Sequence, residues 1–98
     1  MNEEIHPKRA AILEHIEAQE LEDVVLLDGL DTAILGLVKL HPNGATVVAY
    51  SIKKILTSLV ADGMDEDEAY EYFNFNIECL YVGLNTPVFV QDEQDFTL

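Results

Sequence analysis

The chain has 98 residues, of which 49% are hydrophobic and 24% are charged, and this balance is typical of a folded globular protein. We therefore expect one domain over residues 1–98, with residues 91–98 forming a loose acidic tail. Nineteen Asp and Glu against five Lys and Arg give a formal net charge of −14. This charge disfavours direct binding to nucleic acid or anionic lipid and suits a basic protein partner, although acidity also serves solubility alone.

Several features of the sequence predict a cytoplasmic location. The single cysteine, Cys79, excludes an internal disulfide, so no oxidising compartment is indicated. Glu3 and Glu4 have the wrong charge for a secretory signal, and no apolar run approaches the ~18 residues that a membrane span needs.

The first expected elements are a helix and a strand. Pro7 suits the first position of a helix and His6 the cap before it, with an apolar stripe running to about Glu20. The stripe consists of Ile12, Leu13 and Ile16. The short apolar run at residues 24–27 has the length and the β-branched residues of a strand.

A β-hairpin is expected next, from two apolar runs at residues 33–40 and 46–50. The linking residues 41–44, His-Pro-Asn-Gly, suit a type I turn closed by a left-handed glycine. Neither run alternates with polar residues as a half-solvated strand would. The second face of the hairpin must therefore be covered by a helix or by another subunit.

Two helices and a last strand complete the predicted fold. Ser51 suits the cap of a helix that ends at Gly63, and Asp65 with Glu68 suits the capped, acidic start of the next helix. That second helix is expected to run to about residue 82, before a strand at residues 88–90. The inward stripes are Ile52, Ile55, Leu56, Leu59 and Val60 in one helix, and Ala69, Phe73, Ile77 and Leu80 in the other. The expected class is α+β, with a small antiparallel sheet packed by about three helices in the order α-β-β-β-α-α-β.

The aromatic residues after the acidic helix start cannot all face one way. Phe73 belongs to the core stripe, whereas Tyr72 and Phe75 lie on another side and suggest a second buried surface. That surface packs either against the first helix, which we favour slightly, or against another subunit. Asn76 needs partners if it is buried, and we expect it to hold the loop at residues 83–87.

The sequence offers little catalytic or metal-binding chemistry. His6, His15 and His41 show no metal-ligand spacing, and Cys79 has no histidine nearby in sequence, so a small buried hydrophobe is the simpler interpretation of the cysteine. No phosphate-binding glycine loop, Ser-His-Asp set or calcium-binding loop is present. We therefore expect no cofactor, no metal and no enzymatic activity.

The strongest candidate for a functional site is a cluster of carboxylates around the acidic helix start. We call these five residues the acidic set: Asp62, Asp65, Glu66, Asp67 and Glu71. The simplest interpretation is a solvated helix start. The alternative is a patch that docks on Lys and Arg of a partner and mimics phosphates.

From residue 63 onwards the sequence contains a Gly-Met helix start, an acidic turn, an aromatic run ending Phe-Asn-Ile, and a Val-Gly-x-x-Thr-Pro-x-Phe exit. This pattern resembles that of a family of small acidic proteins of tailed bacteriophages and prophages. The matching residues are Gly63, Met64, Glu68, Ala69, Glu71, Tyr72, Phe73, Phe75, Asn76, Ile77, Val82, Gly83, Thr86, Pro87 and Phe89, and, in the hairpin, Asp31, Ala33, Ile34, Gly36, Val38, Val48 and Tyr50. The resemblance implies a phage or prophage origin and a shared fold, and it brings no established activity or catalytic residue.

The first functional hypothesis is a non-enzymatic phage accessory protein in the host cytoplasm. It would bind a host or phage protein that is basic or handles nucleic acid, through the acidic set, as an anti-defence inhibitor or nucleic-acid mimic in its most specific form. The alternative is a self-associating structural protein, a homodimer without a host target. A salt-sensitive heterologous complex would favour the first hypothesis, and a salt-resistant homodimer the second.

Overall fold

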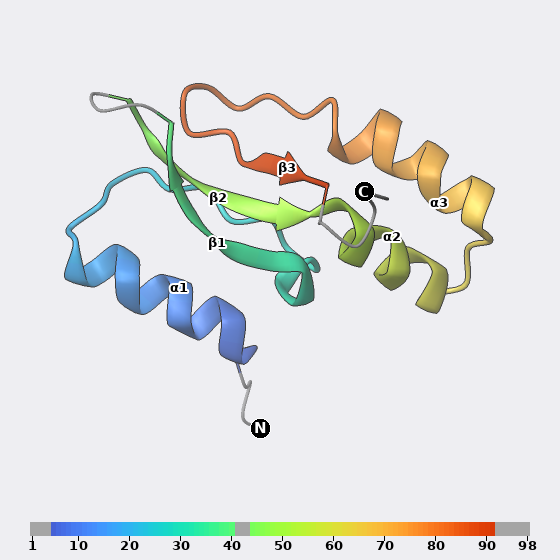
Figure 1. Ribbon diagram of the computed structural model, residues 1–98, viewed down its shortest axis with the longest axis horizontal. Helices are drawn as coiled ribbons and strands as arrows, with labels where there is room; N and C mark the ends of the chain where they lie inside the picture. The colour runs from blue at the N-terminus through green and yellow to red at the C-terminus, as the bar shows by residue number, and fades with distance from the viewer. Residues whose placement is uncertain (1–4, 41–43, 92–98) are drawn as a thin grey trace, which may run out of the picture.

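The computed structural model describes residues 5–40 and 44–91 and confirms the α+β class. The elements are α1 (Pro7–Ala18), a 3-10 turn η1 (Asp31–Ala33), β1 (Ile34–Lys39), β2 (Thr46–Ser51), α2 (Ile52–Ala61), α3 (Glu66–Tyr72), a π-helical turn η2 (Phe73–Ile77) and β3 (Val88–Val90). Figure 1 shows α1 running below the hairpin of β1 and β2, with α2 and α3 beyond the end of β2. None of the helices in the described ranges is long and apolar enough to cross a membrane.

The hairpin forms as predicted, with β1 antiparallel to β2. Its register shifts between Ile34 and Gly36, so Leu35 is an extra residue in β1, and its side chain is 46% exposed. Residues 47–51 of β2 are all buried, so both faces of this central strand are covered within the chain. The predicted turn at residues 41–43 lies outside the described residues.

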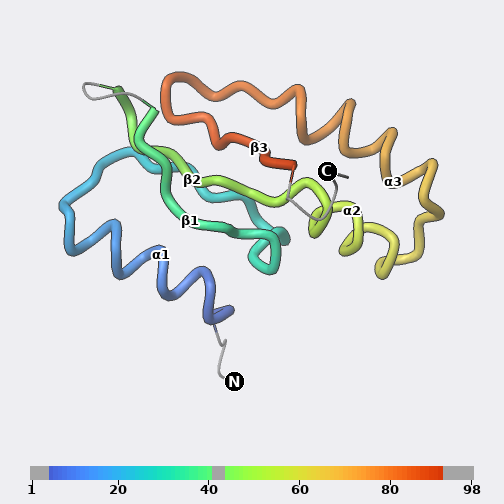
Figure 2. Tube along the Cα trace, in the orientation of Figure 1, coloured from blue at the N-terminus to red at the C-terminus, as the bar shows by residue number. Residues whose placement is uncertain are grey.

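The third strand differs from the prediction, because β3 pairs with β2 in parallel and the sheet is mixed. The chain leaves β2 directly into α2 and returns only after α3, η2 and a loop, as the trace in Figure 2 shows. A connection of this length crosses over and brings β3 in from the same end as β2.

The predicted strand at residues 24–27 pairs with no strand of the sheet. Val24, Leu26 and Leu27 instead pack against the core as an irregular segment. The buried Tyr50 side chain fixes this segment, because the Leu27 N–H donates to the Tyr50 hydroxyl oxygen at 2.8 Å. The apolar run was therefore a sign of burial, and its backbone bonding comes from a side chain far away in sequence.

The core lies between the sheet and the helices and contains the predicted Phe73, which is 2% exposed. The Phe73 ring meets the Phe89 ring edge to face, with centroids 5.5 Å apart, and this contact joins η2 to β3. Leu13 and Val60, at the margins of their predicted stripes, are 38% and 39% exposed. On the opposite side, Arg9 of α1 donates to Asp31 Oδ1 at 2.9 Å and ties α1 to η1.

The predicted helix starts are all confirmed. The His6 side chain accepts from the Lys8 N–H, and the Ser51 side chain accepts from the Lys54 N–H. Each of these residues satisfies an N–H group that the first turn of its helix leaves without a partner.

The last helix is shorter than predicted and ends at Ile77 rather than near residue 82. Its final turn is a π-turn, in which the Glu78 N–H donates to the Phe73 carbonyl at 2.7 Å. Asn and the aromatic residues in this run have only moderate helix propensity, so the local sequence does not enforce a longer α-helix.

Two polar residues beyond α3 have environments other than those predicted. Cys79 is exposed and not a buried hydrophobe, and its thiol donates to the Asn74 carbonyl at 2.8 Å. Asn76 is also exposed and does not hold the loop before β3. Thr86 does so: its hydroxyl donates to the Gly83 carbonyl at 2.6 Å and accepts from the Val82 N–H at 2.9 Å.

Candidate protein-binding surface

The acidic set gathers around the junction between α2 and α3, and all five side chains are exposed. Asp62 is the residue that ends α2, Asp65 is the N-cap of α3, and Glu66 and Asp67 belong to its first turn. Glu71 lies one turn further along α3. The chain reverses between the two helices at Gly63, whose positive φ of 117° suits a glycine at this position.

Asp65 has a structural task in addition to any binding role. Its Oδ1 accepts from the Glu68 N–H at 2.8 Å, and Glu68 Oε1 accepts in return from the Asp65 N–H at 3.1 Å. This capping box fixes both side chains, and the carboxylates of the first turn are stabilised by the helix dipole. The acidity of this turn is thus partly explained by the fold. Glu71, beyond the first turn, has no such explanation.

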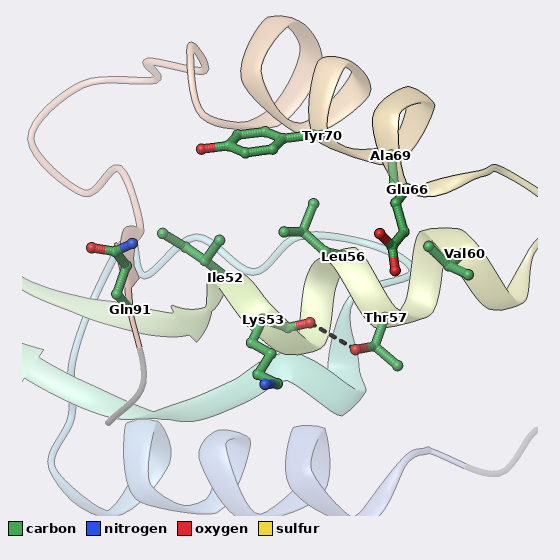
Figure 3. Close-up of a pocket in the computed structure, with 9 residues that line it drawn as sticks. All are labelled: Ile52, Lys53, Leu56, Thr57, Val60, Glu66, Ala69, Tyr70 and Gln91. Atoms are coloured by element: carbon green, nitrogen blue, oxygen red, sulfur yellow. Dashed lines mark hydrogen bonds between the residues drawn. The ribbon is translucent and has the colours of Figure 1, made fainter. Parts of the chain in front are cut away.

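One flank of α3 borders an open groove of about 440 Å³ between α2 and α3. Figure 3 shows the Tyr70 ring facing Ile52 and Leu56 across this groove, with the Glu66 carboxylate beside them. The lining residues are Ile52, Lys53, Leu56, Thr57, Val60, Glu66, Ala69, Tyr70 and Gln91. We call it the α2–α3 groove; its floor is mainly aliphatic, and the predicted residue Glu66 lies on its rim.

The other flank of α3 has two adjoining hollows that share Tyr72 and Asn76. The aromatic hollow, of about 360 Å³, is lined by Met64, Glu68, Glu71, Tyr72, Phe75 and Asn76. The aliphatic hollow, of about 300 Å³, is lined by Leu27, Asp28, Gly29, Leu30, Leu59, Tyr72, Asn76, Ile77 and Leu80. Glu71, the second predicted residue that borders a depression, lies at the aromatic hollow.

Large exposed apolar side chains continue along this flank and into the loop before β3. Tyr72 is 43% exposed and Phe75 is 74% exposed, so the favoured prediction that they pack against the first helix is wrong. Tyr81 and Leu84 in the following loop are 74% and 81% exposed. Tyr72 and Phe75 border the same hollow, and adjoining exposed apolar side chains of this kind are typical of an interaction surface.

Positive charges are confined to the first part of the chain, and the sequence alone shows this segregation. All five Lys and Arg, and all three His, precede Ile55, so α3, η2, the following loop and β3 carry ionisable charge of one sign only. Counting charge by segment would have added Glu68, which lines the aromatic hollow, to the candidate residues. It would also have singled out this half of the chain as a surface of uniformly negative charge.

No three His, Cys, Asp or Glu side chains come together as possible metal ligands within residues 5–40 and 44–91. Burial raises the pKa of the Tyr50 hydroxyl above its ordinary value, but this group lies in the core and holds Leu27. The features that single out the surface around α3 are therefore its exposed carboxylates and aromatic side chains.

Comparisons with known proteins add no further information on this surface. The resemblance to small phage proteins accordingly rests on the sequence motifs given above. The chain matched no protein-family model, no curated protein and no solved structure.

Proposed function

We propose that this protein binds a basic protein partner through the surface around α3. The observation that carries the proposal is the interleaving of exposed carboxylates with exposed aromatic side chains, on a segment without a cation. Carboxylates attract Lys and Arg and set the orientation of a complex, and buried aromatic side chains supply much of its affinity. A phage accessory role, directed at a host protein that handles nucleic acid, is the form of this proposal that the sequence resemblance favours.

The apolar side chains distinguish protein binding from simple imitation of phosphates. A nucleic-acid mimic needs mainly carboxylates, whereas Tyr70, Tyr72 and Phe75 add apolar area that a phosphate-binding groove would leave unpaired. The α2–α3 groove has the open, apolar form that accepts one face of an amphipathic segment. Mimicry remains the narrower proposal, and competition by DNA or RNA for the same partner tests it.

The experiment is a selection of binding peptides from a random display library, using the immobilised protein as bait. Peptides rich in Lys and Arg together with apolar residues should be enriched, and their binding should weaken at high salt because exposed charge pairs are screened beyond ~8–10 Å. A triple variant, Glu66→Gln, Asp67→Asn and Glu71→Gln, should weaken binding by at least about 1 kcal/mol.

A matched control carries the same change of net charge elsewhere. Glu14→Gln, Glu17→Gln and Glu22→Gln neutralise three exposed carboxylates on and just after α1. This control should keep the affinity of the wild type, because the lost charges lie outside the contact surface. Equal losses in both triple variants would mean that net charge alone attracts the peptides, and would refute a docking surface at α3.

Self-association is the second candidate function, and the exposed Phe75, Tyr81 and Leu84 are the observation that favours it. Two copies meeting at this surface would bring like charges together, because Glu68 and Glu71 line the same hollow as Phe75. A dimer of this kind should strengthen as salt screens the repulsion. Light scattering at low and high salt separates it from a complex with a basic partner, which salt weakens.

A further inference from the structure

We propose that the aromatic hollow beside α3 binds an arginine side chain of the partner, and that the adjoining aliphatic hollow takes an apolar side chain of the same segment. This inference rests on the proposed function, because it names the chemistry that the partner presents. It concerns the flank of α3 opposite to the α2–α3 groove.

The geometry of α3 brings the required groups together. Glu68, Tyr72 and Phe75 follow one another at spacings of four and three residues, and Glu71 lies between them at three residues from Glu68. Residues at these spacings share one face of a helix, with Cβ atoms about 5–6 Å apart. All four line the same hollow of about 360 Å³. Two carboxylates and two aromatic rings therefore border one depression.

The charge and polarity of the side chains that line the aromatic hollow favour an arginine side chain as its ligand. The two carboxylates of Glu68 and Glu71 are like charges on adjacent turns, and they favour a bound cation. The exposed rings of Tyr72 and Phe75 need an apolar or planar group against their faces. Arginine supplies both properties, because its planar guanidinium stacks on aromatic rings and pairs with carboxylates.

The site is partly preorganised by the fold. Glu68 is held in the capping box through its bond with the Asp65 N–H at 3.1 Å, so little side-chain freedom remains to be lost on binding. On the same turn Phe73 is buried in the core, whereas Phe75 is 74% exposed and available to a partner. The exposed amide of Asn76, shared by both hollows, is placed to bond with the backbone of the bound segment.

The lining of the aliphatic hollow indicates which kind of partner residue would lie next to the arginine. It meets the aromatic hollow at Tyr72 and Asn76, and Leu30, Leu59 and Ile77 are among its lining residues. A leucine-sized side chain close to the arginine would fit within it. The proposed recognition element is therefore a short segment that carries Arg and an aliphatic residue.

The test is an NMR titration of the full chain with three capped tetrapeptides, Ala-Arg-Ala-Leu and the same peptide with Lys or with citrulline in place of Arg. Citrulline keeps the planar shape of arginine without its charge. The arginine peptide should shift the ring signals of Tyr72 and Phe75 in a saturable manner, more strongly than the lysine peptide, and the citrulline peptide should bind weakest. Phe75→Ala and Glu71→Gln should each weaken binding about two- to five-fold, with Glu14→Gln as the unaffected control.

Two results would overturn the inference: equal binding of the citrulline and arginine peptides, or shifts centred away from Tyr72 and Phe75. Failure here is distinguishable from failure of the proposed function. Suppose that the titration fails but library selection still returns basic peptides, which the Glu66, Asp67 and Glu71 triple variant does not bind. The proposed binding surface around α3 would then be supported, and the arginine site would be refuted. If neither the selection nor the titration detects basic ligands, both proposals fall.

Discussion

Two phenylalanines on the same π-turn offer a sharp test of how this segment divides between core and surface. Phe73 is 2% exposed and packs edge to face on Phe89, whereas Phe75, two residues later, is 74% exposed. Removing a buried Phe side chain costs about 3–5 kcal/mol. For a domain whose total stability is about 5–15 kcal/mol, Phe73→Ala should therefore remove a large part of it. Phe75→Ala should change the free energy of unfolding by no more than about 0.5 kcal/mol.

The assay is urea unfolding followed by far-ultraviolet circular dichroism, with each variant compared with the wild type at the same pH and salt. The two substitutions remove the same atoms from the same turn, so each is the control of the other. If Phe75→Ala were as destabilising as Phe73→Ala, the turn would bury both rings and the aromatic hollow would not exist. If both were neutral, the proposed packing of η2 on β3 would be wrong.

Three further predictions concern the core and the helix ends. Burial raises the pKa of Tyr50, so its ionisation favours the unfolded chain. The contribution of Tyr50 to the free energy of unfolding should be constant below about pH 10 and should fall above it. Tyr50→Phe should lose this decline in urea titrations, and at neutral pH it should be less stable because Leu27 loses its acceptor. In thermal unfolding, Glu20→Gly should stabilise the protein by up to about 1 kcal/mol, because Glu20 has a left-handed φ of 55° that glycine adopts without strain. Gly63→Ala should destabilise the protein by a similar amount, because Gly63 has a φ of 117° that alanine rarely adopts. Asp65→Ala should cost about 1 kcal/mol in urea unfolding, while Asp65→Asn, which can still cap, should be nearly neutral.

The sequence predicted those features that neighbouring residues determine. The caps at His6, Ser51 and Asp65 each depend on contacts within three residues, and all three are present. The turn after α2 depends on Gly63 alone. Such signals need no knowledge of the rest of the fold, so they can be read from a single sequence.

The features that were missed depend on residues far apart in the chain. The backbone of Leu27 is bonded by Tyr50, which is 23 residues away, so local composition could not show that residues 24–27 are irregular. The direction of β3 depends on the path of the whole connection from Ser51. Helical spacing placed Phe75 away from the core stripe, but its exposure depends on where α1 packs, which is against β1 and η1. The end of the last helix at Ile77 follows a π-turn, a departure from the period on which helical stripes are predicted.

The case for function rests on those parts of the candidate surface that the fold does not need. The capping box accounts for Asp65 and Glu68, and the helix dipole accounts for the other carboxylates of the first turn. Neither accounts for Glu71, nor for the exposure of Tyr72 and Phe75 to solvent. Solubility alone would favour polar residues at these positions. A partner that supplies positive charge and apolar surface together accounts for both features, and this is why the proposed contact extends beyond the acidic first turn along the flank of α3.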